Sequence, residues 1–259
     1  MLQIQAIPGF TDNYFWLLSH AGYAGAAVVD PGDAAPVLRR LQALGLQLET
    51  ILITHKHADH IGGIPALKAA WPNAVVYGPQ DEPIQQLEQR VGQGDTLTLP
   101  GLHCSLQVLD VPGHTEGHIA YYSPGSLFCG DTLFAGGCGR VFSGTFAQLH
   151  AALQQLAALP PETQVFCAHE YTQDNLGFAA WVEPDNVALR ERIQQVDHLR
   201  ANNQATVPST LAVELATNPF LRTTNASVIR AAEAWAGHAL TTPAAVFQAL
   251  RTWKDKEYD

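Results

Sequence analysis

T-H-K-H-A-D-H, residues 54–60, places three imidazoles and one carboxylate in a single short loop. The loop follows a strand-like apolar run, T-I-L-I at residues 50–53, and precedes the glycine pair Gly62-Gly63. Imidazole nitrogens and carboxylate oxygens are ligands that zinc and similar divalent ions accept. In a chain of this composition the pattern H-x-H-x-D-H arises by chance with a probability of roughly 10⁻³. The loop therefore predicts a metal site.

Other strand-like apolar runs lead directly to His114, Asp131 and His169. Rigid strand ends fix the positions of ligands, so this repetition predicts that the side chains converge. The candidate ligands are His55, His57, Asp59, His60, His114, Asp131 and His169. Seven ligands are too many for one tetrahedral ion, but they suit two ions that share one carboxylate and a hydroxide. Solvent-occupied coordination positions are typical of catalytic sites, and two-metal centres commonly drive hydrolysis.

The composition restricts the class of protein. The chain has 259 residues, of which 47% are hydrophobic and 15% charged, which is typical of one large or two modest globular domains. A net charge of −10 argues against nucleic acid as a partner. We expect no secretory signal, no membrane span and a cytoplasmic location. The four cysteines are scattered without a CxxC pair, so we expect buried, reduced thiols.

Strands mixed with helices in the first two thirds predict an α/β or α+β layered architecture. The expected strands are 2–7, 13–19, 26–30, 50–54, 74–77, 96–99, 105–111, 119–123, 126–129 and 164–167, and the expected helices are 34–44, 64–71 and 146–159. After about residue 173 we expect no strand. Helices over 187–202, 226–238 and 243–253, with caps at Asn225 and Thr242, predict a helical second domain of about 85 residues.

The motifs carry a family resemblance. T-H-K-H-A-D-H (54–60), P-G-H-T-E-G-H (112–118), G-D-T-L-F (130–134) and A-H-E-Y-T (168–172) resemble the metallo-β-lactamase superfamily. F-A-G-G-C-G-R (134–140), T-V-P-S-T-L (206–211), N-P-F-L-R (218–222) and R-T-W-K-D (251–255) resemble the glyoxalase II, or hydroxyacylglutathione hydrolase, family. The resemblance implies an α+β fold, namely an αββα metallo-β-lactamase sandwich over residues 1–173, and a helical substrate-binding domain over 174–259.

The resemblance also implies roles for the ligands. It assigns His55, His57 and His114 to one ion, assigns Asp59, His60 and His169 to the other, and makes Asp131 the bridge. Asp59 and Asp131 are then the catalytic carboxylates, together with a metal-bridging hydroxide. The cofactors are two divalent ions, zinc in the first place, with iron or manganese as alternatives. His118, the second histidine of P-G-H-T-E-G-H, is not a ligand in this family, and we expect it to be buried and hydrogen-bonded.

The family reaction is the second step of methylglyoxal detoxification. A hydroxide bound by the dinuclear metal centre cleaves S-D-lactoylglutathione and related S-2-hydroxyacylglutathiones to glutathione and D-lactate. The leaving thiolate has a pKa of about 8.5 and needs no strong general acid. By the same resemblance Arg140, Tyr171, Arg251 and Lys254 hold the glutathione moiety. Phe142 stands where family members often carry tyrosine. We expect a small-molecule substrate, no nucleic acid or membrane partner, and a monomer.

Two alternatives differ in their metal sites. The first alternative is another enzyme of the same fold, such as a glutathione persulfide dioxygenase, a lactonase, a phosphodiesterase or a β-lactamase. A dioxygenase would use one iron with two histidines and one carboxylate, which makes Asp59, His60 and His169 superfluous as ligands. The second is a non-catalytic metal-binding module. Structural zinc sites need only four ligands, usually rich in cysteine, and this chain has no clustered cysteines.

Overall fold

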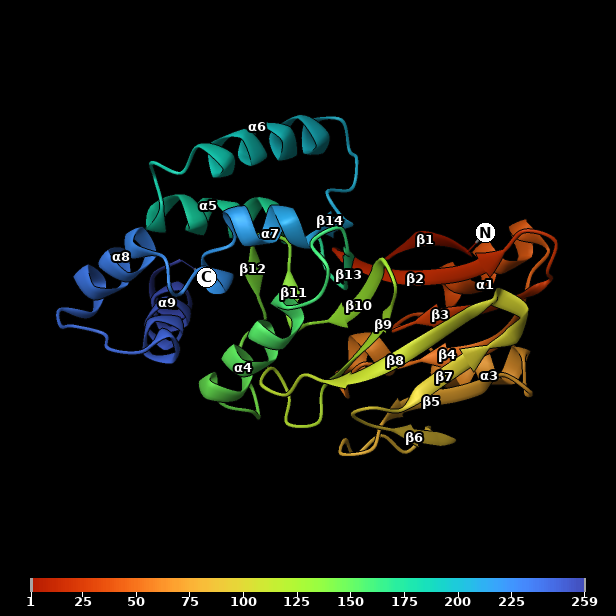
Figure 1. Cartoon of the computed structure of the whole chain (residues 1–259). Helices are drawn as coiled ribbons and strands as arrows, with labels where there is room; N and C mark the ends of the chain where they lie inside the picture. The colour runs from red at the N-terminus through yellow and green to blue at the C-terminus, as the bar shows by residue number, and fades with distance from the viewer. Residues whose placement is uncertain (1, 259) are drawn as a thin grey trace. The chain divides into compact units, whose positions relative to one another are not determined.

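The computed structural model describes residues 2–258, and the chain divides into two units (Figure 1). Unit 1 contains the residues up to Asp110 together with Thr115–Gly130. Unit 2 contains Val111–His114 and the chain from Asp131 onward. Each unit is described separately below.

The first sheet of unit 1 has six strands in the order β1-β2-β3-β4-β5-β6. Pairing is antiparallel from β1 to β3 and parallel from β3 to β6. The strands are β1 (Leu2–Gly9), β2 (Asn13–His20), β3 (Gly25–Val29), β4 (Gln47–Leu52), β5 (Val75–Pro79) and β6 (Gln89–Val91). Every residue of β3 is buried, which is the pattern of a strand covered on both faces.

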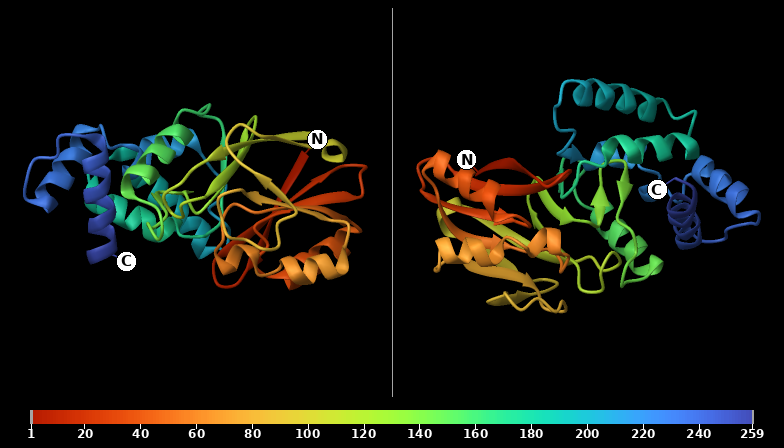
Figure 2. Two further views of the ribbon diagram at one scale, coloured as in Figure 1. Left: turned by 90° about the horizontal axis from the view of Figure 1, so that it is seen from below. Right: turned by 180° about the vertical axis from the view of Figure 1, so that it is seen from behind.

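Helices α1 (Ala34–Leu44) and α3 (Ile64–Ala70) pack on this sheet, and α2 (Ala58–Ile61) is a single turn between them in the chain. The Asp33 side chain accepts a hydrogen bond from the backbone of Ala35, and Gly45 ends α1 in the left-handed conformation. Val37, Leu41 and Leu67 join side chains of β1 to β5 in one apolar core. Two further views show the same elements (Figure 2).

The second sheet of unit 1 is an antiparallel meander of β7 (Thr96–Leu99), β8 (Cys104–Asp110), β9 (Ile119–Ser123) and β10 (Ser126–Gly130), with the 3₁₀ turn η1 (Pro100–Leu102) between β7 and β8. It is bonded to the residues that follow β4. The Tyr121 hydroxyl donates to the Ile53 carbonyl at 2.8 Å, and the Ile119 backbone N–H donates to the Thr54 carbonyl at 3.0 Å. Both sheets therefore support the start of the histidine loop.

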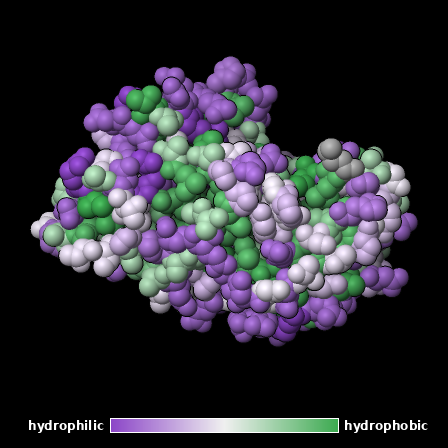
Figure 3. Space-filling model, viewed as in Figure 1, coloured by the Kyte–Doolittle hydropathy of each residue, from purple (hydrophilic) through white to green (hydrophobic). Residues whose placement is uncertain are grey.

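Unit 2 is mostly helical. Its elements are β11 (Leu133–Phe134), β12 (Gly137–Cys138), α4 (Phe146–Ala157), β13 (Gln164–Cys167), α5 (Thr172–Val182), α6 (Val187–Ala201), β14 (Ser209–Thr210), α7 (Leu211–Thr217), η2 (Pro219–Leu221), α8 (Ala226–Ala236) and α9 (Pro243–Glu257). The predicted caps are confirmed, because the Asn225 and Thr242 side chains accept hydrogen bonds from the first turns of α8 and α9. The surface over α6 is mostly hydrophilic (Figure 3).

Two features of unit 2 differ from the expectations. Strand β14 pairs antiparallel with β13, with Val165 opposite Ser209, so the expectation of no strand after residue 173 is wrong. The reason is that a two-residue strand has no periodicity of its own and exists only through its long-range partner. Helix α5, which was not predicted, runs across residue 173. The domain boundary at 173/174 stays a prediction.

The burial of the cysteines agrees with the expectation. All four cysteines are free and buried. Burial raises the pKa of the Cys138 thiol to about 11, despite the nearby Arg251 charge, so this thiol is protonated at neutral pH. No helix within residues 2–258 combines the length and the apolar character that crossing a bilayer requires.

Candidate metal centre

The four predicted ligands of unit 1 lie in the loop after β4 and in helix α2, which follows it. His55 is fully buried, and its Nε2 lies 3.0 Å from Nδ1 of His57. Asp59 and His60 follow within α2, where Nε2 of His60 lies 3.4 Å from Oδ2 of Asp59. The loop thus presents its donor atoms as two pairs, His55 with His57 and Asp59 with His60.

A buried carboxylate, Asp30, orients two of these histidines. Its Oδ1 accepts from the Thr54 backbone at 2.8 Å, and its Oδ2 accepts from the Thr54 hydroxyl at 2.7 Å and lies 3.1 Å from Nδ1 of His60. Because that hydroxyl donates its one proton to Asp30, it accepts from Nδ1 of His55 at 3.1 Å. Both histidines therefore carry the proton on Nδ1 and present the Nε2 lone pair.

The sequence reasoning missed Asp30 and Asn13. Asn13 donates from Nδ2 to Oδ2 of Asp59 at 3.0 Å and so fixes that carboxylate. A signal for Asp30 was present, because it directly follows the apolar run 26–29 in the same way that Asp131 follows its strand. Asp30 lies outside the motifs that predict the ligands.

The predicted ligands of unit 2 are His114, Asp131 and His169, and both histidines lie close to the carboxylate of Asp131. Nε2 of His114 lies 3.5 Å from Oδ2 of Asp131, and Nε2 of His169 lies 3.4 Å from Oδ1. Nδ1 of His114 lies 2.8 Å from the Arg140 carbonyl, which can only accept, so this nitrogen carries the proton and Nε2 carries the lone pair. The two oxygens of one carboxylate thus face two different histidines.

These distances fit bound metal ions. With metal–ligand bonds of 2.0–2.1 Å in a tetrahedral site, neighbouring donor atoms lie about 3.3–3.4 Å apart. The pairs His60–Asp59, His114–Asp131 and His169–Asp131, at 3.4–3.5 Å, match this edge. Acceptor atoms held this close, with their lone pairs exposed, repel one another unless a cation or proton lies between them. All seven predicted ligands belong to His/Asp groups that could hold metal ions.

Gly32 makes room for the carbonyl of Asp59. A Cβ at residue 32 would lie 1.8 Å from that oxygen. We expect Gly32→Ala to displace α2, to lower the melting temperature by several degrees and to weaken metal binding, because backbone atoms cannot rotate away as a side chain can. Thermal unfolding with and without added metal measures both effects. Gly22→Ala is the control, because nothing lies within 4 Å of a Cβ there, although its positive φ adds some strain. Equal melting temperatures for Gly32→Ala and the parent chain would contradict the prediction.

All four residues predicted to hold substrate lie in unit 2. The Tyr171 ring stacks on that of the ligand His169, with centroids 4.7 Å apart. The Arg140 side chain is half exposed, and its Nε lies 3.5 Å from Oδ1 of Asp255. Lys254 is buried, with Nζ 5.6 Å from the centroid of the Tyr258 ring.

Arg251 is buried like Lys254, at 1% exposed, and its guanidinium is hydrogen-bonded inside the unit. Its Nη1 donates to the Cys138 carbonyl at 3.0 Å, and its Nη2 donates to Oδ1 of Asp255 at 2.9 Å. The same carboxylate oxygen lies near Arg140, so Asp255 joins the two guanidinium groups. Arg251 therefore ties α9 to the segment that leads to Arg140.

Arg251→Ala is expected to destabilise unit 2 by about 2 kcal/mol, because it leaves the Cys138 carbonyl without its donor and removes a charged hydrogen bond to Asp255. Urea unfolding measures the loss. The control is Arg39→Ala, which removes an exposed guanidinium from α1. A variant as stable as this control would show that the buried contacts of Arg251 contribute nothing to stability.

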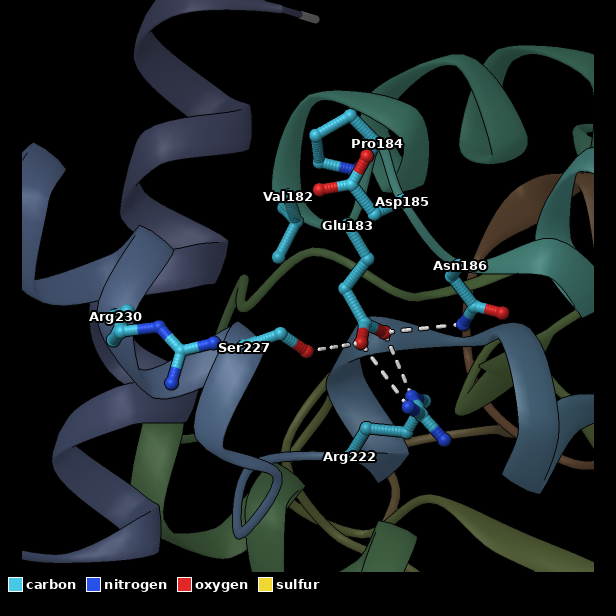
Figure 4. A pocket seen from close by; sticks show the side chains of 8 residues that line it. All are labelled: Val182, Glu183, Pro184, Asp185, Asn186, Arg222, Ser227 and Arg230. Carbon is cyan, nitrogen blue, oxygen red and sulfur yellow. Dashed lines mark hydrogen bonds and ion pairs between the residues drawn. The ribbon is translucent and has the colours of Figure 1, made fainter.

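A pocket of about 450 Å³ in unit 2 is lined by side chains that bond to one another and join three segments of the chain, so we call it a structural joint (Figure 4). Burial would raise the pKa of Glu183, but hydrogen bonds from Arg222 and Ser227 outweigh it and lower the pKa. The Arg222 guanidinium donates to both carboxylate oxygens, at 2.7 and 3.1 Å, and Asn186 contacts the same group. These groups satisfy one another and link α5 to the segments around η2 and α8.

Comparison with known families agrees with this fold and these residues. The model of the metallo-beta-lactamase superfamily matches residues 12–169. The solved structure of BLEG-1 B3 metallo-beta-lactamase has a TM-score of 0.65 at 22% identity, covering 85% of this chain and 99% of that one. The fold is therefore the expected α+β metallo-β-lactamase fold with a C-terminal helical domain, and the chain is a member of this superfamily.

The second family model is narrower. It describes the hydroxyacylglutathione hydrolase C-terminus and matches residues 170–257. Hydroxyacylglutathione hydrolases from Alkalilimnicola ehrlichii and Pseudomonas fluorescens are 54% and 52% identical to this chain, each covering 99% of this chain and 100% of the relative. The chain belongs to the hydroxyacylglutathione hydrolase (glyoxalase II) family. The family resemblance is thereby confirmed, and the findings favour this hydrolase over the dioxygenase or lactonase.

One further solved structure is similar to this chain. TTHA1623 in a di-iron-bound form has a TM-score of 0.59 at 27% identity, covering 83% of this chain and 98% of that one.

Proposed function

We propose that this chain hydrolyses S-D-lactoylglutathione, and related S-2-hydroxyacylglutathiones, to glutathione and the free hydroxy acid. The observation that carries the proposal is Asp131, whose two oxygens face two different histidines as a bridging ligand requires. The substrate follows from the names of the full-length relatives. The similarity of these relatives to this chain covers both the residues that contain the proposed ligands and the C-terminal helices.

The metal centre is proposed to hold two ions, most readily zinc. His55, His57 and His114 hold the first, Asp59, His60 and His169 hold the second, and Asp131 bridges them. The His/Asp groups and the donor distances within each unit support this division. Imidazole and carboxylate donors also accept iron or manganese, and the di-iron form of TTHA1623 shows one such choice in that protein.

When bound, two divalent ions supply a hydroxide nucleophile at neutral pH and stabilise the negative charge that develops on the thioester oxygen. The chain's own residues orient this chemistry. Asp59 is fixed by Asn13 before substrate arrives, and the two oxygens of Asp131 face His114 and His169, so bound cations would fix that carboxylate. The thiolate leaves without a general acid.

Substrate holding is proposed for Arg140, Tyr171 and Lys254, with Arg251 supporting them. The carboxylates of glutathione favour cationic partners, and Arg140 is the more accessible of these cations. The Tyr171 ring lies beside a proposed metal ligand, where the reacting part of the substrate must come. Arg251 acts through Asp255 and the Cys138 carbonyl.

A substrate panel tests the proposed function. S-D-lactoylglutathione, a lactone, a phosphodiester and a β-lactam are assayed with the purified chain, with and without chelator. We expect chelator-sensitive hydrolysis of the thioester to exceed the other three rates by orders of magnitude. Faster turnover of any of the other three would overturn the proposal.

The proposal also covers the domain division, the oligomeric state and the location of the chain. The chain comprises a catalytic domain over 1–173 and a substrate-binding domain over 174–259, acts as a monomer and works in the cytoplasm. Light scattering during gel filtration tests the monomer, for which we expect the mass of one 28.0 kDa chain.

A further inference from the structure

Lys56 stands between two proposed ligands, His55 and His57, and its ammonium group contacts a buried carboxylate. Nζ of Lys56 lies 3.3 Å from Oε2 of Glu82, and the two side chains are 31% and 1% exposed. A carboxylate buried this deeply requires an opposite charge or hydrogen bonds to compensate for its lost hydration. Lys56 supplies that charge from within the ligand loop itself.

Glu82 holds a second loop with its other oxygen. Oε1 accepts a hydrogen bond from the Gly117 backbone at 3.3 Å. Gly117 immediately precedes His118, whose ring stacks on that of His55 with centroids 4.5 Å apart and planes at 18°. A Cβ at residue 117 would lie 2.6 Å from the Asp81 carbonyl, so glycine is needed for this close approach.

The backbone around Glu82 is itself fixed by Arg90. The Arg90 guanidinium donates to the carbonyls of Gln80, Glu82 and Ile84 at 3.2, 3.0 and 2.9 Å. A side chain that starts from so constrained a backbone has a determined position. The Glu82 carboxylate therefore has the rigidity needed to orient what it contacts.

We propose that Glu82 is a positioning residue for the ligand pair His55 and His57. It acts on His57 and its neighbours through Lys56, and on the ring stacked against His55 through Gly117. This preorganises the pair before a metal ion binds, which lowers the cost of ordering the loop at binding. The inference rests on the metal centre of the proposed function, but it concerns metal affinity rather than the reaction.

The other ligand pair of the loop has its own supports. Asn13 fixes Asp59, and Asp30 fixes His60. Loss of the Glu82 contact should therefore weaken the binding of one of the two ions and leave the affinity for the other nearly unchanged. A general loss of stability would not produce this selectivity.

Stepwise metal binding to the metal-free, full-length chain tests the inference. Zn²⁺ is titrated against a chromophoric chelator, and Co²⁺ is added in parallel to record its visible absorption. Glu82→Gln keeps an oxygen for Gly117 but removes the ion pair. We expect one of the two dissociation constants to rise about tenfold or more, with a changed Co²⁺ spectrum at that step, and the other to stay within about twofold.

Variants of Lys56 separate the ion pair from folding. Lys56→Arg keeps the charge and should behave like the parent chain. Lys56→Met should weaken the same ion as Glu82→Gln and at least as strongly, because it leaves the buried Glu82 carboxylate without an opposite charge. The double variant should be no worse than Lys56→Met, because both substitutions act on the same ion pair. Lys68→Met removes a lysine ion pair away from the ligand loop, together with hydrogen bonds of Lys68 to the Pro72 and Ala74 carbonyls; it is the control and should change neither constant.

Two results would overturn the inference: unchanged constants in Glu82→Gln, whether or not the melting temperature falls, or equal weakening of both ions. A parent chain that takes up only one ion contradicts the dinuclear centre of the proposed function. In that case the effect of Glu82→Gln on the affinity for that one ion still decides the inference.

Discussion

Asp131→Ala is expected to lower kcat for S-D-lactoylglutathione by about 10³-fold or more. The reason is that each carboxylate oxygen of Asp131 faces a different histidine, so one substitution removes a ligand from both proposed ions. Loss of a single well-placed electrostatic group from such a site already costs about 10²–10³-fold. Steady-state kinetics, with the metal content of the same sample, measure the effect.

The control is Asp185→Ala, which removes an exposed carboxylate near the joint at Glu183. It should leave kcat and metal content unchanged. Near-normal turnover by Asp131→Ala, with two ions bound, would refute the bridging role.

Removal of metal is expected to abolish activity and to lower the melting temperature. Without cations, acceptor atoms 3.4–3.5 Å apart repel one another. A metal ion that binds only the folded chain stabilises it by about 2.7 kcal/mol when its concentration is a hundredfold above its dissociation constant. Dialysis against chelator, followed by addition of Zn²⁺ in steps, should restore both properties, with saturation near two ions per chain.

The measurement requires elemental analysis and activity on the same fractions. One tightly bound ion per chain with full activity would contradict the dinuclear centre. Full activity of the metal-free chain would contradict any metal role.

Local rules predicted the amphipathic elements well. The helix over 34–44 has the expected bounds because Asp33 caps it and Gly45 ends it, and both signals are short-range. Helix α5 gave no such signal: it has no side-chain cap, its buried face includes the polar Thr172 and Asn175, and the apolar Trp181 is exposed, so its sequence shows no clean apolar stripe. The three-residue strand β6 is largely exposed and too short to show an alternation of buried and exposed residues.

The candidate site was predictable where ligand chemistry restricts the residue type. Histidine and aspartate at strand ends identified the seven candidate ligands, and the structure shows their pairing within each unit. The residues that orient them were not predictable, because Asp30 and Glu82 act through contacts between segments far apart in the chain. The burial of Arg251 is a similar case: a charged residue on an amphipathic helix ordinarily faces solvent.

The pairing of β13 with β14 has a consequence for the chain while it is being synthesised. The ligand His169 lies two residues beyond β13, and the partner strand at Ser209 leaves the ribosome 40 residues later. At roughly 5–20 residues per second this interval lasts several seconds, during which β13 has an unpaired edge open to other nascent chains. The contacts described above for the histidine loop of unit 1 lie within residues 13–121, so they can form before this interval begins. The full ligand set of the second proposed ion, which includes His169, is therefore completed after the histidine loop has formed.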